Sequence, residues 1–479
     1  MSEKNINRRD FIKLAGTSAA VTAVAMSGCG DNVKTEKIIG ENITSKKEIP
    51  TDKMTYRTNP KTGDKISVLG YGFMRLPTVN NQSARENGQE EIDQEQVNRL
   101  TDFAIEHGLN LFDTSPAYCQ GRSEHSMGIA LSRHPRNKYF ISTKLSNFAP
   151  PSWSREASIG MYQNSLKELQ TEYLDYLHLH GIGMGANFEG KELSGLEAFD
   201  KRYIENGVLD YLMKERQEGR IKNLGFSYHG DVKVFDYLVD NHDKWHWNFA
   251  MIQMNYVDWK YAKKINPRNT DAEYLYNRLT EKGIPVFIME PILGGRLAKL
   301  PTHLSKVLRE RIPENSIASW SFRWIATHKN VLTILSGMTY MEHLQDNLST
   351  LCPLQECTDE ENNVLQRVAD EFVNFPLVPC TQCQYCMPCP YGVDIPGSFT
   401  HYNKCVNEGY IAVSTQDKDF VINRKRFLIG YDRKVDKKRQ AAHCIGCGVC
   451  MPHCPQGIQI PERLTDINNY IEKLRQEKL

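Results

Sequence analysis

Short apolar runs alternate with longer amphipathic stretches along the chain from Met54 onward. The longer stretches, such as residues 93–108 and 154–170, place apolar residues three and four positions apart, which is the spacing of one face of a helix. The short runs are rich in β-branched and aromatic residues and have the length of buried strands. Eight such runs predict strands, at residues 67–72, 110–115, 139–145, 173–180, 223–228, 251–257, 285–290 and 331–337.

Eight strand–helix repeats over roughly 300 residues are typical of a (β/α)8 barrel, the TIM barrel. We therefore predict an α/β fold with this barrel at residues 54–352. A doubly wound sheet is the rival fold, but it would carry a G-x-G-x-x-G fingerprint after its first strand. The stretch at that place, GYGFMRLP at residues 70–77, does not match this fingerprint.

Polar side chains stand where three of the predicted strands stop. Asp113 ends the second strand and Tyr118 follows five residues later, Lys144 stands near the end of the third strand, and His180 ends the fourth. In a TIM barrel the chemistry sits at the carboxyl-terminal ends of the strands. Any one of these residues alone is more often a loop residue or a hydrogen-bonded buried polar group. The four together predict a catalytic site.

These four residue types suit proton transfer to a carbonyl oxygen while hydride reaches the carbon atom. A tyrosine is a weak acid with a pKa of about 10, and a nearby ammonium group favours its phenolate form. An aspartate paired with the lysine would keep that ammonium charged and in place. A histidine can orient the substrate oxygen or share the proton.

The stretches FDTSPAYCQGRSE, ISTKL, DYLHLH, GFSYHG, QMNYVD, EPILGG and SGMTYMEHLQDN occur in an order and at a spacing that resemble the aldo-keto reductase family. The resemblance covers residues 54 to 350. It implies a (β/α)8 barrel with NADP(H) as cofactor, bound without a Rossmann motif, and a small carbonyl or alcohol substrate. Asp113, Tyr118, Lys144 and His180 would form the catalytic tetrad. The implied cofactor contacts are Ser227 and Gln253 at the nicotinamide end, and Pro291, Gly294, Asp346 and Asn347 along the rest.

Three features differ from the usual pattern of that family. Tyr228 follows the serine of GFS, where asparagine is frequent, and Cys119 follows the tyrosine, where glycine is usual. The last loop, SGMTYMEHLQDN, has no lysine or arginine for a cofactor 2′-phosphate and offers only His343.

Eight of the thirteen cysteines gather in two motifs, CTQCQYCMPCP at residues 380–390 and CIGCGVCMPHCP at residues 444–455. A predicted polar helix within residues 353–375 separates them from the barrel, and the motifs define a mainly helical domain at residues 376–470. Cysteines so close together cannot all form disulfides with good geometry. Zinc sites use C-x2-C pairs, usually two pairs for each ion. A C-x2-C-x2-C run followed by Cys-Pro is the pattern of a 4Fe–4S cluster.

The two motifs also repeat each other and resemble a bacterial two-cluster ferredoxin across residues 380–461. In that family the fourth cysteine of each motif binds the other cluster. The resemblance therefore implies one cluster on Cys380, Cys383, Cys386 and Cys454, and a second on Cys444, Cys447, Cys450 and Cys389. The first motif is one residue shorter before its fourth cysteine, which crossed ligation tolerates because that distance is not a constraint within one cluster.

Composition limits the classes of partner. The chain has 479 residues and a formal net charge of +1. Nucleic-acid binding requires a strongly basic face, so we expect no nucleic-acid partner. A chain of this length can bury a large core and carry an accessory domain. Beyond the first thirty residues no apolar run is long enough to cross a bilayer.

The first 29 residues read as an export signal. Arg8 and Arg9 begin the block RRDFIK, which precedes a weakly apolar stretch and resembles a twin-arginine signal. The stretch MSGC ends at Cys29 and resembles a lipobox, which would make this cysteine an acylated membrane anchor. Residues 30–53 read as a flexible linker. The sequence thus predicts a periplasmic or lipid-anchored protein exported by the twin-arginine route.

Three functions remain open from the sequence. The first is an oxidoreductase of aldo-keto reductase type, in which the clusters transfer electrons or stabilise the C-terminal region and a redox protein is a possible partner. The second is an exported electron-transfer protein whose barrel is a docking platform without hydride transfer. The third is a barrel that binds a sugar or another carbonyl ligand at the cell surface without turnover. Hydride carries two electrons and a cluster carries one, and no flavin motif that could link them is visible.

Overall fold

The computed structural model describes residues 49–79, 91–373, 377–412 and 414–479. The predicted export signal with Cys29 and most of the predicted linker lie outside these residues. The described residues fall within one compact unit of the chain. None of their helices is both long enough and apolar enough to cross a membrane.

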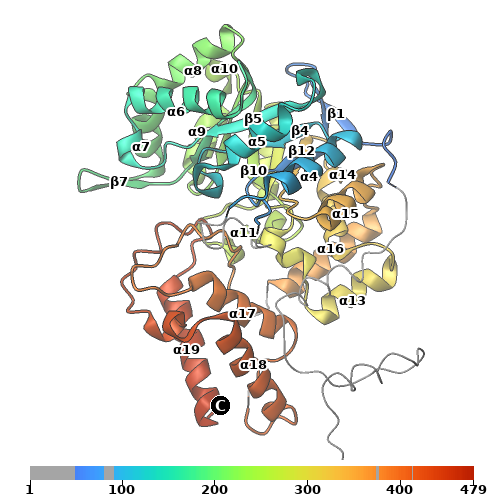
Figure 1. Cartoon of the computed structure of the whole chain (residues 1–479), viewed down its shortest axis with the longest axis vertical. Helices are drawn as coiled ribbons and strands as arrows, with labels where there is room; N and C mark the ends of the chain where they lie inside the picture. The colour runs from blue at the N-terminus through green and yellow to red at the C-terminus, as the bar shows by residue number, and fades with distance from the viewer. Residues whose placement is uncertain (1–48, 80–90, 374–376, 413) are drawn as a thin grey trace, which may run out of the picture. The chain divides into compact units, whose positions relative to one another are not determined.

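Eight parallel strands close into a barrel with helices around it, so the predicted fold class is confirmed (Figure 1). Around the barrel the strands follow the order β10, β11, β12, β3, β4, β5, β6, β9, and β9 pairs with β10 to close the ring. Each of the eight barrel strands overlaps one of the eight predicted runs. The strands are β3 (Leu69–Gly72), β4 (Leu111–Asp113), β5 (Phe140–Leu145), β6 (Leu174–Ile182), β9 (Ile221–Tyr228), β10 (Phe249–Gln253), β11 (Val286–Met289) and β12 (Val331–Ser336).

The first predicted strand is shorter than expected. Ser67 belongs to an antiparallel hairpin formed by β1 (Tyr56–Thr58) and β2 (Lys65–Ser67). The Ser67 N–H donates to the side-chain oxygen of Asn110 at 2.8 Å instead of continuing the barrel ladder. Ile66 of the hairpin is fully buried with residues of the barrel interior.

Aromatic side chains fill the inside of the barrel. The ring centroids of Tyr176 and Phe249 lie 5.1 Å apart, and those of Phe249 and Phe287 lie 4.7 Å apart. Gly225 makes room for them, because a Cβ at this position would stand 2.3 Å from the backbone oxygen of Phe249. The barrel is therefore a packed core, and open space for a ligand is at its ends.

The barrel helices carry apolar stripes toward the strands. The first turns of three helices are fixed by polar side chains: Asp93, Ser154 and Ser316 each accept a hydrogen bond from the backbone N–H three residues later. The helices are α4 (Gln94–Glu106), α5 (Ser123–Leu131), α6 (Arg155–Glu168), α7 (Gly195–Phe199), α8 (Val208–Gln217), α9 (Val232–Asp240), α10 (His242–Trp245), α11 (Asp258–Ile265), α12 (Ala272–Glu281), α13 (Thr302–Arg311), α14 (Ile317–Thr327) and α15 (Met341–Leu351).

Several short elements extend the loops. A hairpin of β7 (Ala186–Phe188) and β8 (Lys191–Leu193) follows β6. A π-helical turn, η4 (Asp200–Ile204), comes before α8. The 3-10 turns in the barrel region are η1 (Tyr118–Gly121), η2 (Arg136–Lys138), η3 (Pro150–Ser152) and η5 (Leu293–Ala298).

After the barrel, α16 (Asp359–Phe372) begins with a capping box between Thr358 and Glu361. The C-terminal part then packs three helices, α17 (Ile395–Asn407), α18 (Phe420–Lys434) and α19 (Ile460–Gln476), against one another. These helices share an apolar core of their own, separate from that of the barrel. Two 3-10 turns, η6 (Lys437–Arg439) and η7 (Ala441–His443), lead into the second cysteine motif.

Candidate active site and cluster sites

Lys144 and Asp113 form a buried ion pair at the carboxyl ends of the neighbouring strands β5 and β4. The Lys144 Nζ donates to Asp113 Oδ1 at 2.5 Å and to the backbone oxygen of Thr114 at 2.7 Å. The Ser142 hydroxyl donates to the other Asp113 oxygen at 2.7 Å. Burial raises the pKa of Asp113, and the Lys144 ammonium and these hydrogen bonds oppose that shift. The aspartate thereby holds the ammonium in one position.

Tyr118 lies beside this pair. It begins the turn η1, and its N–H donates to the Ser115 backbone oxygen at 3.0 Å. The Lys144 Nζ stands 4.7 Å from the centre of the Tyr118 ring. The His180 ring meets the Tyr118 ring edge-on, with centroids 6.0 Å apart. The structure therefore brings the four predicted catalytic residues together at one end of the barrel.

His180 is held as a neutral imidazole. Burial lowers its pKa well below the usual value, and the positive charge of Lys144 lowers it further. Its Nδ1 lies 2.6 Å from the Ser146 hydroxyl, and its backbone oxygen accepts from Arg202 at 2.7 Å. When Ser146 donates to Nδ1, the proton of the neutral ring sits on Nε2. Nε2 can then donate to a substrate oxygen.

Two titratable side chains near this site were not predicted. Glu124, in the first turn of α5, is buried and accepts from the Thr143 hydroxyl at 2.6 Å. Burial raises the pKa of Glu124 to about 7. His229 follows β9, and burial together with the charge of Lys144 lowers its pKa to about 4. A glutamate in the first turn of a helix usually faces water, so no local pattern marked Glu124.

Ser227 and Gln253 lie near the ends of the adjacent strands β9 and β10, where Ser227 is in register with Met251. The Ser227 hydroxyl accepts from the Gly181 N–H at 2.9 Å, and the Gln253 amide donates to Asp258 at 2.8 Å. The Gln253 Oε1 is buried and has no hydrogen-bond partner among the described residues. An acceptor left in this state fits a donor such as the carboxamide of a nicotinamide ring.

The loop after β11 holds the next two predicted contacts. The Pro291 backbone oxygen accepts from the Ser321 hydroxyl at 2.5 Å, and Gly294 has a φ of +64°. Thr381 of the first cysteine motif packs on this glycine, since a Cβ at position 294 would stand 2.5 Å from the Thr381 Cβ. The first cysteine motif therefore contacts the loop that was predicted to bind the cofactor.

Asp346 and Asn347, the last two predicted cofactor contacts, form hydrogen bonds with other residues of the barrel. Asp346 accepts from the Ser316 hydroxyl at 2.7 Å, and the Asn347 amide donates to the Ser336 hydroxyl at 3.0 Å. Burial raises the pKa of Asp346, which the bond from Ser316 opposes. These bonds tie α15 to the start of α14 and to the end of β12.

The last loop lacks lysine and arginine, but the fold places two cations near it. Burial lowers the pKa of His343, and the charges of Lys299 and Arg75 lower it further. Lys299 comes from the loop after β11 and Arg75 from the loop after β3. Glu342 opposes these shifts, so His343 is influenced by one acidic and two basic side chains, and the two cations come from segments far apart in sequence.

The two unusual residues of the barrel have structural explanations. The Tyr228 hydroxyl bonds to the backbone oxygen of Gly230 and lies 3.3 Å from the Thr270 hydroxyl. Cys119 adopts a φ of +48°, a conformation that glycine reaches without strain. Its Sγ lies 3.7 Å from the backbone oxygen of Phe73.

The cysteines of the first predicted cluster lie near one another. The thiols of Cys383 and Cys454 both affect the pKa of Cys380, and the same two thiols act on Cys386. Cys450 is also near enough to affect Cys386. Cys454 therefore lies with the cysteines of the other motif. We call Cys380, Cys383, Cys386 and Cys454 the cluster-one group.

The second set gathers in the same way. The thiols of Cys444, Cys447 and Cys389 all raise the pKa of Cys450. These four cysteines, the cluster-two group, line one small pocket of about 20 Å³. Apolar side chains complete the lining, among them Tyr391, Val393, Ile395, Ile445 and Leu464.

The chemistry of these thiols fits iron–sulfur clusters better than the alternatives. Burial raises the pKa of Cys380 to about 12 and that of Cys450 to about 11, so these thiols would bind as thiolates only to a cation that displaces the proton. Within the described residues all of these cysteines are free thiols, so the structure gives no support to a disulfide scaffold there. The thiolates of a cubane bind four different irons and stand farther apart than the ligands of one zinc ion.

Barrel loops contact both segments that supply the cluster-one group. Arg75 donates to the Thr381 backbone oxygen at 2.5 Å, and Asn266 donates to the Pro455 backbone oxygen at 2.6 Å. Arg75 follows β3 and Asn266 follows α11. The cluster-one group is therefore the one that lies next to the barrel.

Comparison with known proteins agrees with this architecture. Residues 68–370 match the model of the aldo/keto reductase family, and residues 379–459 match the model of the 4Fe-4S dicluster domain. Among similar proteins, L-galactose dehydrogenase of Arabidopsis thaliana is 22% identical over 338 residues, covering 66% of this chain and 96% of that protein. An uncharacterized oxidoreductase of Bacillus subtilis is 24% identical over 334 residues, covering 63% of this chain and 92% of that protein.

An aldo-keto reductase from Bacillus halodurans, solved in a holo form, has the same fold with a TM-score of 0.50 and 22% identity, covering 66% of this chain and 96% of that one. The family model spans more than half of the 479 residues. The chain is an oxidoreductase that belongs to the aldo/keto reductase family and carries a C-terminal domain for two 4Fe–4S clusters.

Proposed function

We propose that the barrel interconverts a carbonyl and an alcohol on a small substrate with NADP(H), and that the clusters transfer electrons. The observation that carries the proposal is the arrangement of Tyr118, Lys144, Asp113 and His180 at one end of the barrel. NADP(H), when bound, supplies or accepts the hydride at the substrate carbon.

The four side chains divide the proton chemistry. Tyr118 gives its hydroxyl proton to the carbonyl oxygen in reduction and takes it back in oxidation. The Lys144 ammonium, 4.7 Å from the ring, stabilises the phenolate that remains. Asp113 fixes that ammonium, and His180 donates a hydrogen bond from Nε2 to the same substrate oxygen.

The cofactor would lie from the β9–β10 edge toward the loops after β11 and β12. Ser227 and the unpartnered Gln253 Oε1 suit the nicotinamide carboxamide. Lys299 and Arg75 suit the phosphates, since both act on His343 beside the last loop. We expect Lys299→Ala to weaken NADPH binding more than NADH binding, measured by fluorescence titration. Equal weakening would argue against a role for Lys299 at the 2′-phosphate.

Phe148 lies next to the reacting residues. Its ring centroid is 4.7 Å from that of His180, and the side chain is 41% exposed. An exposed aromatic ring at this place can stack on the apolar face of a sugar or on an apolar aldehyde. We therefore test aldoses, L-galactose included, together with small aliphatic and aromatic aldehydes.

The direct test compares Tyr118→Phe with Tyr274→Phe in anaerobically purified protein. Tyr274 lies on α12 and its ring is 41% exposed, so its variant is the matched control. We expect Tyr118→Phe to reduce NADPH-dependent turnover by at least about 100-fold and to leave the cluster absorbance unchanged. Full turnover in this variant would refute the assignment of Tyr118.

A second function is favoured by the contact between Thr381 and Gly294. The first cysteine motif packs on a loop that was predicted to bind the cofactor. If this contact blocks the cofactor, the chain is an electron-transfer protein whose barrel serves as a platform. Binding of NADPH, measured by calorimetry on the cluster-loaded protein, separates the two functions, because the platform function predicts none.

We also propose export by the twin-arginine route, with a lipid anchor at Cys29. The support is the sequence alone: the RRDFIK block and the MSGC stretch. Changing Arg8 and Arg9 to lysine should retain the protein in the cytoplasm, and Cys29→Ser should release it from the membrane fraction. Unchanged fractionation of both variants would refute these assignments.

A further inference from the structure

Arg296 is a half-buried cation between the barrel and the cluster-one group, and its Nε and Nη1 atoms are fully buried. It follows Gly294 in the loop after β11, and its guanidinium stacks 4.9 Å from the ring centre of Phe372. Its charge acts on Asp258 and on the Cys380 thiol. Burial lowers the pKa of Arg296 to about 10, so the group stays charged at neutral pH.

Arg296 is bonded unlike the buried arginines of the barrel. Arg323 pairs with Glu361 at 2.8 Å, and Arg202 donates to the His180 backbone oxygen and to Asn147. The Arg296 Nε and Nη1, in contrast, are buried without a hydrogen-bond partner in the described part of the chain. Leaving charged donors buried and without hydrogen bonds destabilises the folded state. A counter-charge is therefore expected at this place.

Three other buried polar atoms nearby share this state. Gln253 Oε1, Asp258 Oδ1 and Thr381 Oγ1 also lack a partner among residues that the structure describes. Gln253 donates to Asp258, and the charge of Asp258 acts on Arg296. The unsatisfied atoms thus extend from the nicotinamide end of the predicted cofactor site to the first cysteine motif.

We propose that Arg296 is the counter-charge of cluster one and, with Asp258, sets the reduction potential of that cluster. A cubane held by four thiolates carries a net negative charge, which grows by one when the cluster is reduced. A nearby cation favours the reduced state and a nearby anion disfavours it. Arg296 therefore raises the potential of cluster one, and Asp258 lowers it by opposing Arg296. This inference depends on the clusters and not on the proposed hydride transfer.

The test is an EPR-monitored redox titration of the full, cluster-loaded protein, which gives one midpoint potential for each cluster. Arg296→Leu should shift one midpoint to a more negative value, and Asp258→Asn should shift the same midpoint to a more positive value. Arg296→Lys keeps the charge and should stay close to the unchanged protein. Arg309→Leu, an exposed arginine on α13, is the matched control and should move neither midpoint.

Shifts of one midpoint potential in opposite directions in the two variants indicate a charge effect, because loss of packing alone would not shift the potential up in one variant and down in the other. Iron content, measured on every variant, shows whether both clusters are present. If Arg296→Leu and Asp258→Asn leave both midpoints unchanged with full iron content, Arg296 is not the counter-charge. If both variants shift the two midpoints in one direction, the effect is structural and the proposal also fails.

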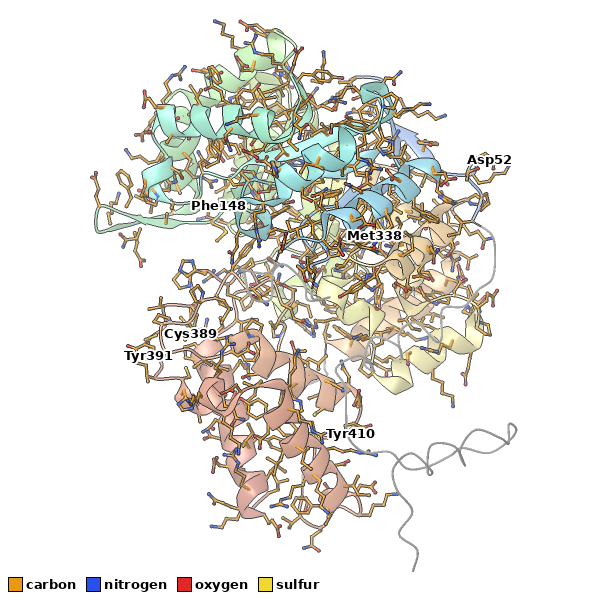
Figure 2. The ribbon with its side chains drawn as sticks, viewed as in Figure 1. Asp52, Phe148, Met338, Cys389, Tyr391 and Tyr410 are labelled. Carbon is orange, nitrogen blue, oxygen red and sulfur yellow. The ribbon has the colours of Figure 1, made fainter. Side chains whose placement is uncertain are left out.

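A different observation concerns the surface around the cluster-two group. Large apolar side chains are exposed there: Ile445 is 62% exposed, and Val449 and Tyr391 are each 51% exposed. Cys447, a predicted ligand, is exposed as well. Cys389 and Tyr391 lie close together in Figure 2. We call Tyr391, Ile445, Cys447 and Val449 the cluster-two face.

A basic segment borders the cluster-two face. Residues 432–439 contain five basic and two acidic side chains, and Lys437, Lys438 and Arg439 are exposed. Arg439 donates to the Gly392 backbone oxygen at 3.3 Å, next to Tyr391. An exposed apolar centre with a charged rim is typical of a protein-binding surface.

We infer that this face docks a small one-electron carrier protein with an acidic surface around its redox centre. One electron passes from the reduced carrier to cluster two, so the carrier is oxidised by one electron and the cluster is reduced by one. The inference rests on the proposed electron transfer by the clusters. Charge complementarity between the acidic carrier and the basic segment would raise the rate of association and make that rate depend on salt concentration.

The probe is a reduced plant-type [2Fe–2S] ferredoxin, mixed with the oxidised protein in a stopped-flow instrument. The variant Lys437→Glu/Lys438→Glu should lower the second-order rate by about tenfold at low salt. The control Lys473→Glu/Lys478→Glu reverses two exposed charges near the other end of α19, about 20 Å from its start, and should keep the rate. Reduction by photoreduced deazaflavin reports cluster competence without protein docking.

Unchanged ferredoxin rates in the first variant would overturn the docking surface. Loss of reduction by both ferredoxin and deazaflavin would show damage to cluster two, and Ile445→Gln, which leaves the charges intact, would then decide by its ferredoxin rate. NADPH-dependent carbonyl reduction is measured in parallel. Its absence in the unchanged protein would refute the proposed hydride transfer without touching the docking result.

Discussion

Asp113 and Lys144 carry opposite charges at a place where neither charge would be stable alone. The side chains are 4% and 1% exposed, and their atoms meet at 2.5 Å. Breaking a buried pair by removing one partner is costly, whereas removing both charges is often tolerated. The pair is therefore retained for the position that it gives the ammonium next to Tyr118.

Removing only the aspartate should expose this cost. We expect Asp113→Asn to lower the free energy of unfolding by about 3 kcal/mol, because Lys144 is left buried without its counter-charge. Asp113→Asn/Lys144→Met should recover most of that loss and still lack turnover. Urea unfolding followed by circular dichroism measures both variants. If Asp113→Asn alone were as stable as the unchanged protein, water would have to reach the pair.

Glu124 predicts a pH dependence of stability. Its pKa in the folded protein is about 7, above the ordinary 4.5, because burial disfavours the charge. The folded state thus binds the proton more tightly, so stability from this group is complete below pH 4.5 and is lost as the pH rises through 7. The free energy of unfolding of Glu124→Gln, relative to that of the unchanged protein, should therefore rise by up to about 3 kcal/mol as the pH rises from 4.5 to 8.

The measurement is thermal unfolding across this pH range, with the exposed Glu106→Gln as control. A constant difference between Glu124→Gln and the unchanged protein at every pH would contradict the assigned burial effect.

At the scale of elements, the barrel depends on close approaches between helices and strands. Gly128 lies in α5 where the end of α6 passes, and a Cβ at this position would stand 2.2 Å from the Glu168 backbone oxygen. Gly160 lies within α6 and has no atom within 4 Å of such a Cβ. Two helical glycines therefore have different roles that the sequence does not distinguish.

Alanine at these two positions should have opposite effects. Gly128→Ala should destabilise the protein by about 2 kcal/mol or more, because backbone would have to move. Gly160→Ala should stabilise it by up to about 1 kcal/mol through helix propensity. Both are measured by urea unfolding, and equal effects would mean that α5 and α6 adjust freely.

At the scale of the whole molecule, the last cysteine of each motif lies near cysteines of the other motif. Cys454 lies with the first motif and acts on Cys380, while Cys389 acts on Cys450 of the second motif. Crossed ligation, as the ferredoxin resemblance implies it, would tie the two ends of the C-terminal domain together, because each cluster would close a loop of the chain. The domain and the barrel then meet through the cluster-one group.

Crossed ligation makes a prediction about which cluster is lost. Cys454→Ser should perturb the cluster whose midpoint responds to Arg296→Leu, although Cys454 belongs to the second motif. Cys389→Ser should perturb the other cluster. Iron analysis and EPR after anaerobic purification check both variants. The reverse assignment would show that each motif holds its own cluster.

Much of the architecture could be predicted from the sequence, because its signals are local. The alternation of apolar runs and amphipathic stretches predicts the eight strands, and the ends of those strands indicate Asp113, Lys144 and His180. The spacing of cysteines indicates the chemistry of the clusters without the fold. Ser67 was misassigned because its bond to Asn110 depends on a segment 43 residues away.

The sequence by itself determined the barrel, the four candidate catalytic residues and the two cysteine motifs, since periodicity and spacing are read along the chain. Only the tertiary structure decided that Glu124 is buried, that Lys299 and Arg75 approach His343, and that Arg296 lies between Asp258 and Cys380. Burial and charge at these places depend on contributions from several loops that are distant in sequence. These contributions combine only once the strands have closed into the barrel and the C-terminal domain has packed against it.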